Sequence, residues 1–345
     1  MRTMSRWRRG GTAINARGTM TATSPMVLYT HGAGRLGNQL IRFTHWMAWV
    51  RAHEGQVEVL DLAFWPYATY FDVWRQHPAC LFPIRPSRMD AWARRLDDLP
   101  GWMRRGGLDR DRWSSLVHVA GRWRPGWQAI TDGGSKSEGI DLDDPVFFPR
   151  VARSPVTTCS GWKIASWRLF EQYQAELRGY FLPAPEFARP AQEFMTLLRA
   201  RYDVLVGVLV RQSDYRVWDG GRFFFTSAPY AGWIRQLLDL HGGRRVGVVV
   251  ASVDWQDPAD FGGLPVHLAS GNPRSAGHWF ENWVELSLCD FIVSAPSTFS
   301  ATAAFVGGVP LWPVVSANQV MAHDQLISDG MVGAARHPEF SRSVK

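Results

Sequence analysis

Arg211 directly follows the apolar run 204–210, and Asp214 stands three residues later. A valine-rich run of this length is typical of a buried parallel strand, and ligands of open α/β sheets bind beyond the carboxyl ends of such strands. A guanidinium is always charged, and its planar fork of N–H donors suits a phosphate or diphosphate. Arg211 is therefore a candidate diphosphate ligand. A structural ion pair between Arg211 and Asp214 is the alternative, and this segment alone favours neither interpretation.

Polar residues follow two further predicted strands. Asp254 comes after the apolar run 246–252 and could accept hydrogen bonds from a nucleobase or ribose, or simply form a turn. Ser297 and Thr298 precede a predicted helix, where hydroxyls and free N–H groups bind anions, although capping alone would explain them. An arginine, an acid and a helix N-terminus at one edge of one sheet together outline a nucleotide diphosphate site.

A glycine-rich turn, Gly34-Arg35-Leu-Gly37-Asn38, lies between a predicted strand at 26–31 and a helix that Asn38 would cap. Glycines allow a tight turn close to a ligand, and the helix N-terminus presents free N–H groups. The spacing is neither the dinucleotide fingerprint nor a phosphate loop. Arg35 and Asn38 would be its polar groups, and a turn needed only for connection is the alternative.

Alternating strands and helices must position these residues. Expected strands are 26–31, 57–62, 204–210, 246–252, 266–268, 291–294 and 310–314, and expected helices are 38–53, 166–180, 192–201, 229–240, 279–288 and 298–306. This alternation indicates parallel sheets covered by helices on both faces. Residues 64–150 predict mixed helix and loop, with a polar loop at 131–138.

The chain is long enough for two domains. We expect a disordered extension at 1–25, an N-terminal domain at 26–190, a C-terminal domain at 191–318 and a tail at 319–345. Three prolines, Pro183, Pro185 and Pro190, predict a linker at this boundary.

Composition excludes several classes of protein. Of the 345 residues, 46% are hydrophobic and 20% charged, which is typical of a globular chain. No apolar run approaches the ~20 residues that span a bilayer. The net charge of +7 comes from scattered arginines, which favours no nucleic-acid role. Three cysteines without metal-type spacing and no secretory signal predict a cytoplasmic protein.

Segments 34–40, 208–215 and 285–300 together resemble the α-1,2-fucosyltransferase family, within the wider group of fucosyltransferases. The resemblance covers most of 26–312, while 64–150 match poorly. It implies a GT-B-like fold, in which two Rossmann-like α/β domains face a cleft. The N-terminal domain would then lie on the acceptor side, and the C-terminal domain would bind the nucleotide sugar. GDP-fucose would be the donor substrate, with no cofactor and no metal.

The resemblance also implies roles for individual residues. Arg211 would grip the donor diphosphate and support departure of GDP, with Asp214 as the acid that closes its motif. Asp254 falls near the region that binds the guanine base in related enzymes. Gly37 and Asn38 match the family's N-terminal loop, which lines the cleft near the fucose. The turn formed by Ser297, Thr298 and Phe299 would bind the donor phosphates.

We therefore expect an inverting glycosyltransferase that moves fucose from GDP-fucose to a hydroxyl of a glycan. His31, Asp72, Asp214 and Glu281 are candidates for the base that accepts the acceptor proton. Leu209 stands where the family has a histidine, which motivates another nucleotide sugar as the alternative donor. A non-catalytic nucleotide- or glycan-binding relative is the second alternative. Acceptor, linkage and oligomeric state stay open.

Overall fold

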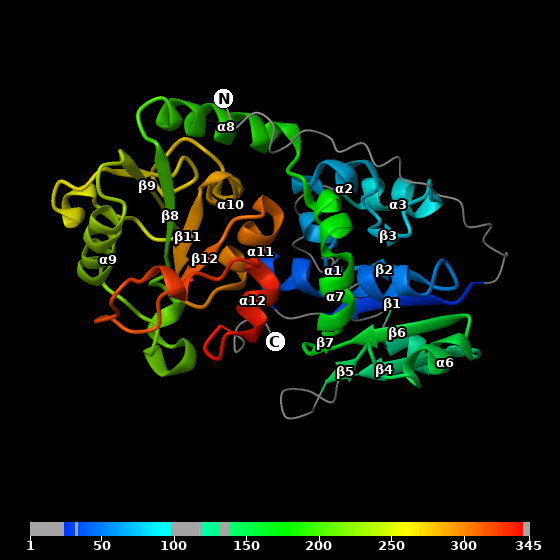
Figure 1. Cartoon of the computed structure of the whole chain (residues 1–345). Coiled ribbons are helices and arrows are strands. Elements are labelled where there is room, and N and C mark those ends of the chain that lie inside the picture. The colour runs from blue at the N-terminus through cyan, green and yellow to red at the C-terminus, as the bar shows by residue number, and fades with distance from the viewer. Residues whose placement is uncertain (1–23, 32–33, 98–116, 118, 132–138, 341–345) are drawn as a thin grey trace. The chain divides into compact units, whose positions relative to one another are not determined.

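A computed structural model of the chain describes residues 24–31, 34–97, 117, 119–131 and 139–340 (Figure 1). The predicted disordered extension lies almost wholly outside the described residues, as does the predicted polar loop after Thr131. Within the described ranges, no helix combines the length and apolarity that crossing a membrane requires.

The chain forms two compact units, and neither is one continuous segment. The first unit comprises Met1–His31, His45–Ala63 and Ala79–Tyr173, and the second comprises Gly32–Thr44, Phe64–Pro78 and Gln174–Lys345. The predicted glycine-rich turn therefore belongs to the second unit. The four predicted domain ranges stay a prediction.

The first unit is built on a five-stranded sheet of order β3-β2-β1-β6-β4 (Figure 1). Three of its pairings are parallel, and β3 pairs with β2 antiparallel. The strands are β1 Met26–His31, β2 Glu58–Asp61, β3 Leu81–Phe82, β4 Trp127–Thr131 and β6 Val156–Ser160, and a separate ladder joins β5 Ile140–Asp141 to β7 Ile164–Ala165. The helices are α3 Arg88–Asp97 and α6 Phe147–Ala152, with most of α7 Trp167–Leu177 and the second half of α1 Leu36–Ala52.

The second unit contains a five-stranded, entirely parallel sheet of order β10-β9-β8-β11-β12. Its strands are β8 Val204–Val210, β9 Val246–Ser252, β10 Val266–Leu268, β11 Phe291–Ser294 and β12 Leu311–Pro313. Its helices are α2 Asp72–Gln76, α8 Pro185–Arg199, α9 Ser227–Leu240, α10 Trp279–Leu288, α11 Thr298–Gly307 and α12 Gly330–Arg336.

The central strand β8 is buried along its whole length, which fits its uninterrupted apolar sequence. Side chains at alternate positions of a strand point to opposite faces. Val204, Val206, Val208 and Val210 share one core cluster with α9, whereas Leu286 and Cys289, at the end of α10, lie against Gly207. Helices thus cover both faces of this sheet, as the sequence predicts.

The α/β class with two mainly parallel sheets is confirmed, and strands β8 to β11 have the predicted bounds. The predicted linker is wrong, because α8 begins at Pro185 and continues through Pro190. Its buried residues Ala191, Met195 and Leu198 stabilise it by tertiary packing despite the missing N–H of Pro190.

Two smaller predictions also need correction. Asn38 is not the cap of α1, because the helix begins two residues earlier, at Leu36. Residues 64–150 contain strands β3, β4 and β5 in addition to helices. The strand β4 carries only one buried residue, Ile130, so it lacks the apolar run from which a strand is recognised.

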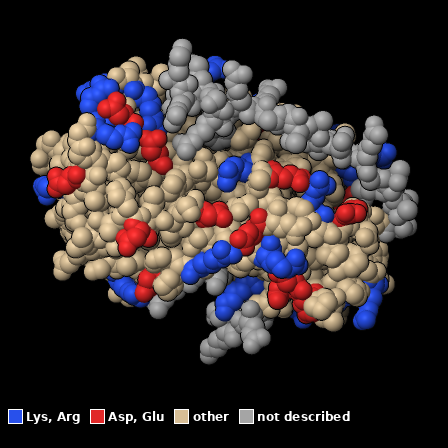
Figure 2. All heavy atoms as spheres, in the orientation of Figure 1, with Lys and Arg blue, Asp and Glu red and all other residues tan. Residues whose placement is uncertain are grey.

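On the face shown in Figure 2, charged side chains form scattered small groups, and many of these groups contain both signs. Ion pairs among the described residues include Arg245 with Asp203 and Arg168 with Asp143.

Candidate active site

Arg211 lies at the carboxyl end of β8, and its side chain is only 14% exposed. Its Nη2 donates to Asp214 Oδ2 at 2.5 Å, and its Nη1 donates to Ser297 Oγ at 3.4 Å. The guanidinium carbon lies 4.8 Å from the centre of the Tyr215 ring. Arg211 therefore makes the predicted ion pair and also reaches the turn before α11.

Two polar atoms of this pair lack a hydrogen-bond partner among the described residues. Both Arg211 Nε and Asp214 Oδ1 are buried from solvent. Buried polar groups are normally paired, because leaving one unpaired costs about 1–3 kcal/mol. Arg199 Nε is also buried and unpaired among the described residues, so the distinguishing feature of Arg211 is its position at the carboxyl end of β8, next to α11.

Tyr215 joins the loop after β8 to the loop after β11. Its hydroxyl donates to the carbonyl of Pro296, and its ring lies beneath the Arg211 guanidinium. Burial raises the pKa of Tyr215, against the lowering effect of the Arg211 charge. The hydroxyl consequently stays protonated and keeps its role as a donor. Through these two contacts, Tyr215 fixes the position of Arg211 relative to the N-terminus of α11.

Ser297 is the N-cap of α11. It has extended backbone angles, and its Oγ accepts the Phe299 N–H at 3.3 Å. The same Oγ contacts Arg211, so the arginine lies at the positive end of the helix. The Phe299 N–H already has a partner in this cap, whereas Thr298 begins the helix and is half-buried.

The glycine-rich turn approaches α11 closely within the second unit. A Cβ added at Gly37 would lie 2.6 Å from the backbone carbonyl carbon of Thr298, a distance that real side chains do not tolerate. Gly34 has φ +96°, and a Cβ there would overlap the side chain of Asn38. Glycine at 37 therefore lets the first turn of α1 lie directly against the first turn of α11. Arg35 is exposed and Asn38 is half-buried.

Asp254 lies beside the same loop. Its Oδ2 accepts the backbone N–H of Ser213 at 2.8 Å, and its own N–H donates to Ser252 Oγ at 3.0 Å. The buried Gln256 strengthens this connection, because its Nε2 donates to Gln212 Oε1 at 3.2 Å. The loops after β8 and β9 are thereby fixed to each other.

The candidate bases have different surroundings. Asp72 is the first residue of α2, is 40% exposed and lies 3.8 Å from Arg75. Glu281 is buried and accepts hydrogen bonds from the His278 N–H at 3.1 Å and from Ser270 Oγ at 2.8 Å. These bonds give Glu281 a structural role in capping α10.

Within the described residues, neither Asp72 nor Glu281 contacts Arg211. The side chain of His31 lies outside the described residues. Of the four candidate bases, Asp214 alone contacts Arg211 within the described residues, through an ion pair.

Known structures with a similar course of the chain are fucosyltransferases. A mutant of Arabidopsis thaliana FUT1 in complex with GDP is 13% identical, over 90% of this chain and 74% of that one, with a TM-score of 0.47. POFUT1 in complex with GDP is 12% identical over 84% and 94%, with a TM-score of 0.47. NodZ, an α-1,6-fucosyltransferase soaked with GDP-fucose, is 12% identical over 86% and 97%, with a TM-score of 0.46. No protein-family model matches the chain, and no curated protein matches it.

Sequence reasoning missed two features of the site. Gln256 shows no signal, because an isolated glutamine in a loop is usually exposed. Trp255 is 42% exposed, and the guanidinium carbon of Arg274 lies 4.5 Å from the centre of its ring. An exposed tryptophan directly after Asp254 could have signalled a stacking surface.

Proposed function

We propose that this protein is an inverting glycosyltransferase that moves fucose from GDP-fucose to a hydroxyl of a glycan. One observation carries the proposal: a buried guanidinium at the end of β8 contacts the N-cap of α11, against which the N-terminus of α1 is packed. Two helix N-termini and one arginine supply three sources of positive potential for a diphosphate. The segments that form this arrangement are those that resemble the fucosyltransferases.

The expected chemistry follows from that charge. The acceptor oxygen attacks C1 of the fucose from the face opposite the diphosphate, and the bond from C1 to the β-phosphate oxygen breaks. Negative charge then grows on the β-phosphate, where Arg211 and the helix N-termini stabilise it. The acceptor proton leaves to a base or to water. Asp214 is paired with the arginine that would bind the diphosphate, on the side opposite the attacking hydroxyl, so we assign none of the four candidates as the base and no metal to the reaction.

Leu209 favours a second candidate, namely another nucleotide sugar on the same scaffold. Its side chain is buried, so it offers no polar group to a donor where the fucosyltransferases have a histidine. A donor screen separates the candidates. A bound donor raises the melting temperature by mass action, so GDP-fucose is expected to raise it more than GDP-mannose, UDP-glucose or dTDP-glucose.

Release of GDP from GDP-fucose tests turnover directly. The proposal predicts slow hydrolysis of GDP-fucose, and faster release when a mixed pool of glycans provides acceptors. A larger thermal shift with a UDP- or dTDP-sugar would favour the second candidate. Tight binding of GDP-fucose without GDP release would identify a non-catalytic binding protein.

A further inference from the structure

The first unit contains a pocket of about 370 Å³ that none of the site residues above lines. Trp49, Leu142 and Leu169 are buried residues of its lining, while Asp143, Phe148 and Tyr173 are half-buried residues around it. Its volume lies at the lower end of small-molecule pockets, which suits a ligand the size of one sugar ring. All lining residues belong to the first unit.

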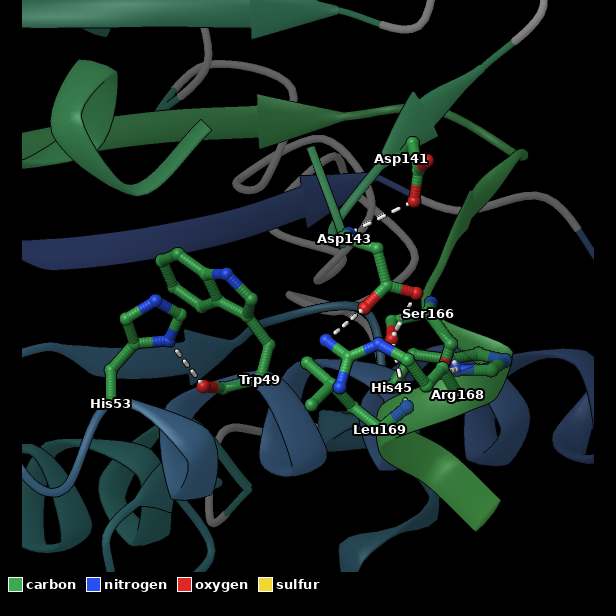
Figure 3. A network of polar contacts seen from close by, with 8 residues as sticks. All are labelled: His45, Trp49, His53, Asp141, Asp143, Ser166, Arg168 and Leu169. Atoms are coloured by element: carbon green, nitrogen blue, oxygen red, sulfur yellow. Dashed lines mark hydrogen bonds and ion pairs between the residues drawn. The ribbon is translucent and has the colours of Figure 1, made fainter. Parts of the chain in front are cut away.

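The carboxylate of Asp143, a lining residue, is held in a network of polar contacts (Figure 3). Asp143 Oδ2 accepts a hydrogen bond from Ser166 Oγ, and Oδ1 accepts one from Arg168 Nη2, each at 2.7 Å. Ser166 is buried and also accepts the Leu169 N–H at 3.0 Å, and the Asp143 N–H donates to Asp141 Oδ1 at 2.9 Å. Asp143 is therefore held by both strand β5 and the start of α7. Such a preorganised polar group can orient a ligand.

Arg168 uses one nitrogen in this ion pair, and its side chain is 66% exposed. Its other N–H groups are therefore open to a ligand. The amide of Gln172 and the hydroxyl of Tyr173 line the same pocket, and neither has a hydrogen-bond partner among the residues that the structure describes. The pocket lining therefore contains both hydrogen-bond donors and acceptors: Arg168 donates, and Gln172 and Tyr173 can do either. Sugar hydroxyls both donate and accept, so they match such a mixture.

The charges of the pocket disfavour an anionic ligand. Asp143 and Arg168 cancel each other, and Asp144 adds a further negative charge to the lining. Among the described lining residues, Arg168 is the only arginine or lysine, so none is left over for a phosphate or carboxylate. The apolar part accessible to a ligand comes from the half-buried Phe148, whose ring stacks on His53 at 4.2 Å between centroids. Aromatic rings can cover the apolar C–H face of a sugar.

We propose that this pocket binds one neutral sugar unit of a glycan. Arg168, Gln172 and Tyr173 would bind its hydroxyls, Asp143 would orient Arg168, and Phe148 would contact its apolar face. The proposal goes beyond sugar transfer, because no donor nucleotide is needed for this binding. A protein that has lost the donor site would keep it.

Saturation-transfer NMR on the full chain tests the proposal, with methyl glycosides of galactose, glucose, mannose and N-acetylglucosamine as probes. At least one is expected to bind, whereas methyl glucuronide and N-acetylneuraminic acid are not. Arg168→Ala is expected to weaken that binding about tenfold or more, as loss of a charged hydrogen-bonding group does. Gln172→Ala, at an exposed position, is expected to weaken it less without disturbing the fold.

Arg245→Ala is the matched control, because Arg245 is 64% exposed, pairs with Asp203 and belongs to the second unit. It is expected to leave sugar binding unchanged. The absence of binding by every neutral glycoside would overturn the proposal, as would equal binding by Arg168→Ala and Arg245→Ala. A preference for the acidic sugars would overturn it too. GDP binding, measured separately on Arg168→Ala, is expected to be unaffected, so failure here stays distinguishable from failure of the transferase proposal.

Discussion

Replacing Arg211 with alanine is expected to abolish most GDP release while the protein stays folded. The side chain supplies a charge-assisted donor where the leaving diphosphate gains charge, and loss of one such donor in other active sites costs about 100- to 1,000-fold in kcat. Its Nη1 also contacts Ser297 Oγ at the N-cap of α11, which places the charge beside a helix N-terminus. We therefore expect a decrease of at least roughly 100-fold, equivalent to about 2.7 kcal/mol.

The chain offers a closely matched control. Arg199 is 16% exposed and pairs with Asp290, which is 41% exposed, whereas Arg211 and Asp214 are 14% and 42% exposed. Asp290 accepts the Leu205 N–H at the beginning of β8, so this pair lies at the opposite edge of the same sheet. The partner carboxylates are comparably exposed, so each alanine variant should lose a similar, modest stability, on the order of 1 kcal/mol. Only Arg211→Ala should lose activity.

The assay measures GDP release from GDP-fucose together with the melting temperature of each variant. Arg211→Lys keeps the charge but loses the planar fork, so its rate should lie between those of the wild type and Arg211→Ala. Removing Arg211 also leaves Asp214 as an uncompensated negative charge, and the melting temperature of the double variant Arg211→Ala/Asp214→Asn separates this effect on stability; its turnover is not compared, because Asp214 belongs to the site. Turnover in Arg211→Ala within about threefold of that in Arg199→Ala would refute the reasoning, because so small a difference lies far below the loss of one oxyanion donor.

Three further predictions concern the elements around this arginine. Gly37→Ala should force α1 away from the backbone of α11 and weaken GDP binding about tenfold by calorimetry, whereas the control Gly232→Ala, in an open position of α9, should bind GDP normally; equal affinities would contradict the close approach. Tyr215→Phe removes a buried hydroxyl donor and should lower the free energy of unfolding by about 1 kcal/mol, and an unchanged urea midpoint would count against this role. Burial raises the pKa of Glu285 to about 8, so the folded state holds a proton that the unfolded state releases near its ordinary pKa of 4.5. Stability should therefore fall as the pH rises from about 4.5 to about 8 and level off above that range. Glu285→Gln should flatten this dependence in urea titrations, and an identical slope in both proteins would disprove the assignment.

Much of the second unit could be predicted from the sequence, because its strands are buried on both faces. The runs that become β8 and β9 are apolar from end to end, and each stops at a polar residue. The position of Arg211 at the end of β8 follows from that stop. Its contact with Ser297 follows from the general rule that parallel strands end at one edge of the sheet.

Other features depended on tertiary contacts that no local pattern reveals. The approach of Gly37 to Thr298 joins segments more than 250 positions apart, and the glycine turn alone is compatible with a simple connection. Pro190 lies within α8 because the buried face of that helix outweighs the local preference of proline for a break. The ligand pocket of the first unit is lined by residues from α1, α6, α7 and the loop after β5, which share no motif.

A crystal structure of the protein with bound GDP tests the central claim most directly. The account predicts β-phosphate oxygens within hydrogen-bonding distance of the Arg211 guanidinium and next to the first turn of α11. A diphosphate bound elsewhere, with Arg211 still paired only with Asp214 and Ser297, would contradict it.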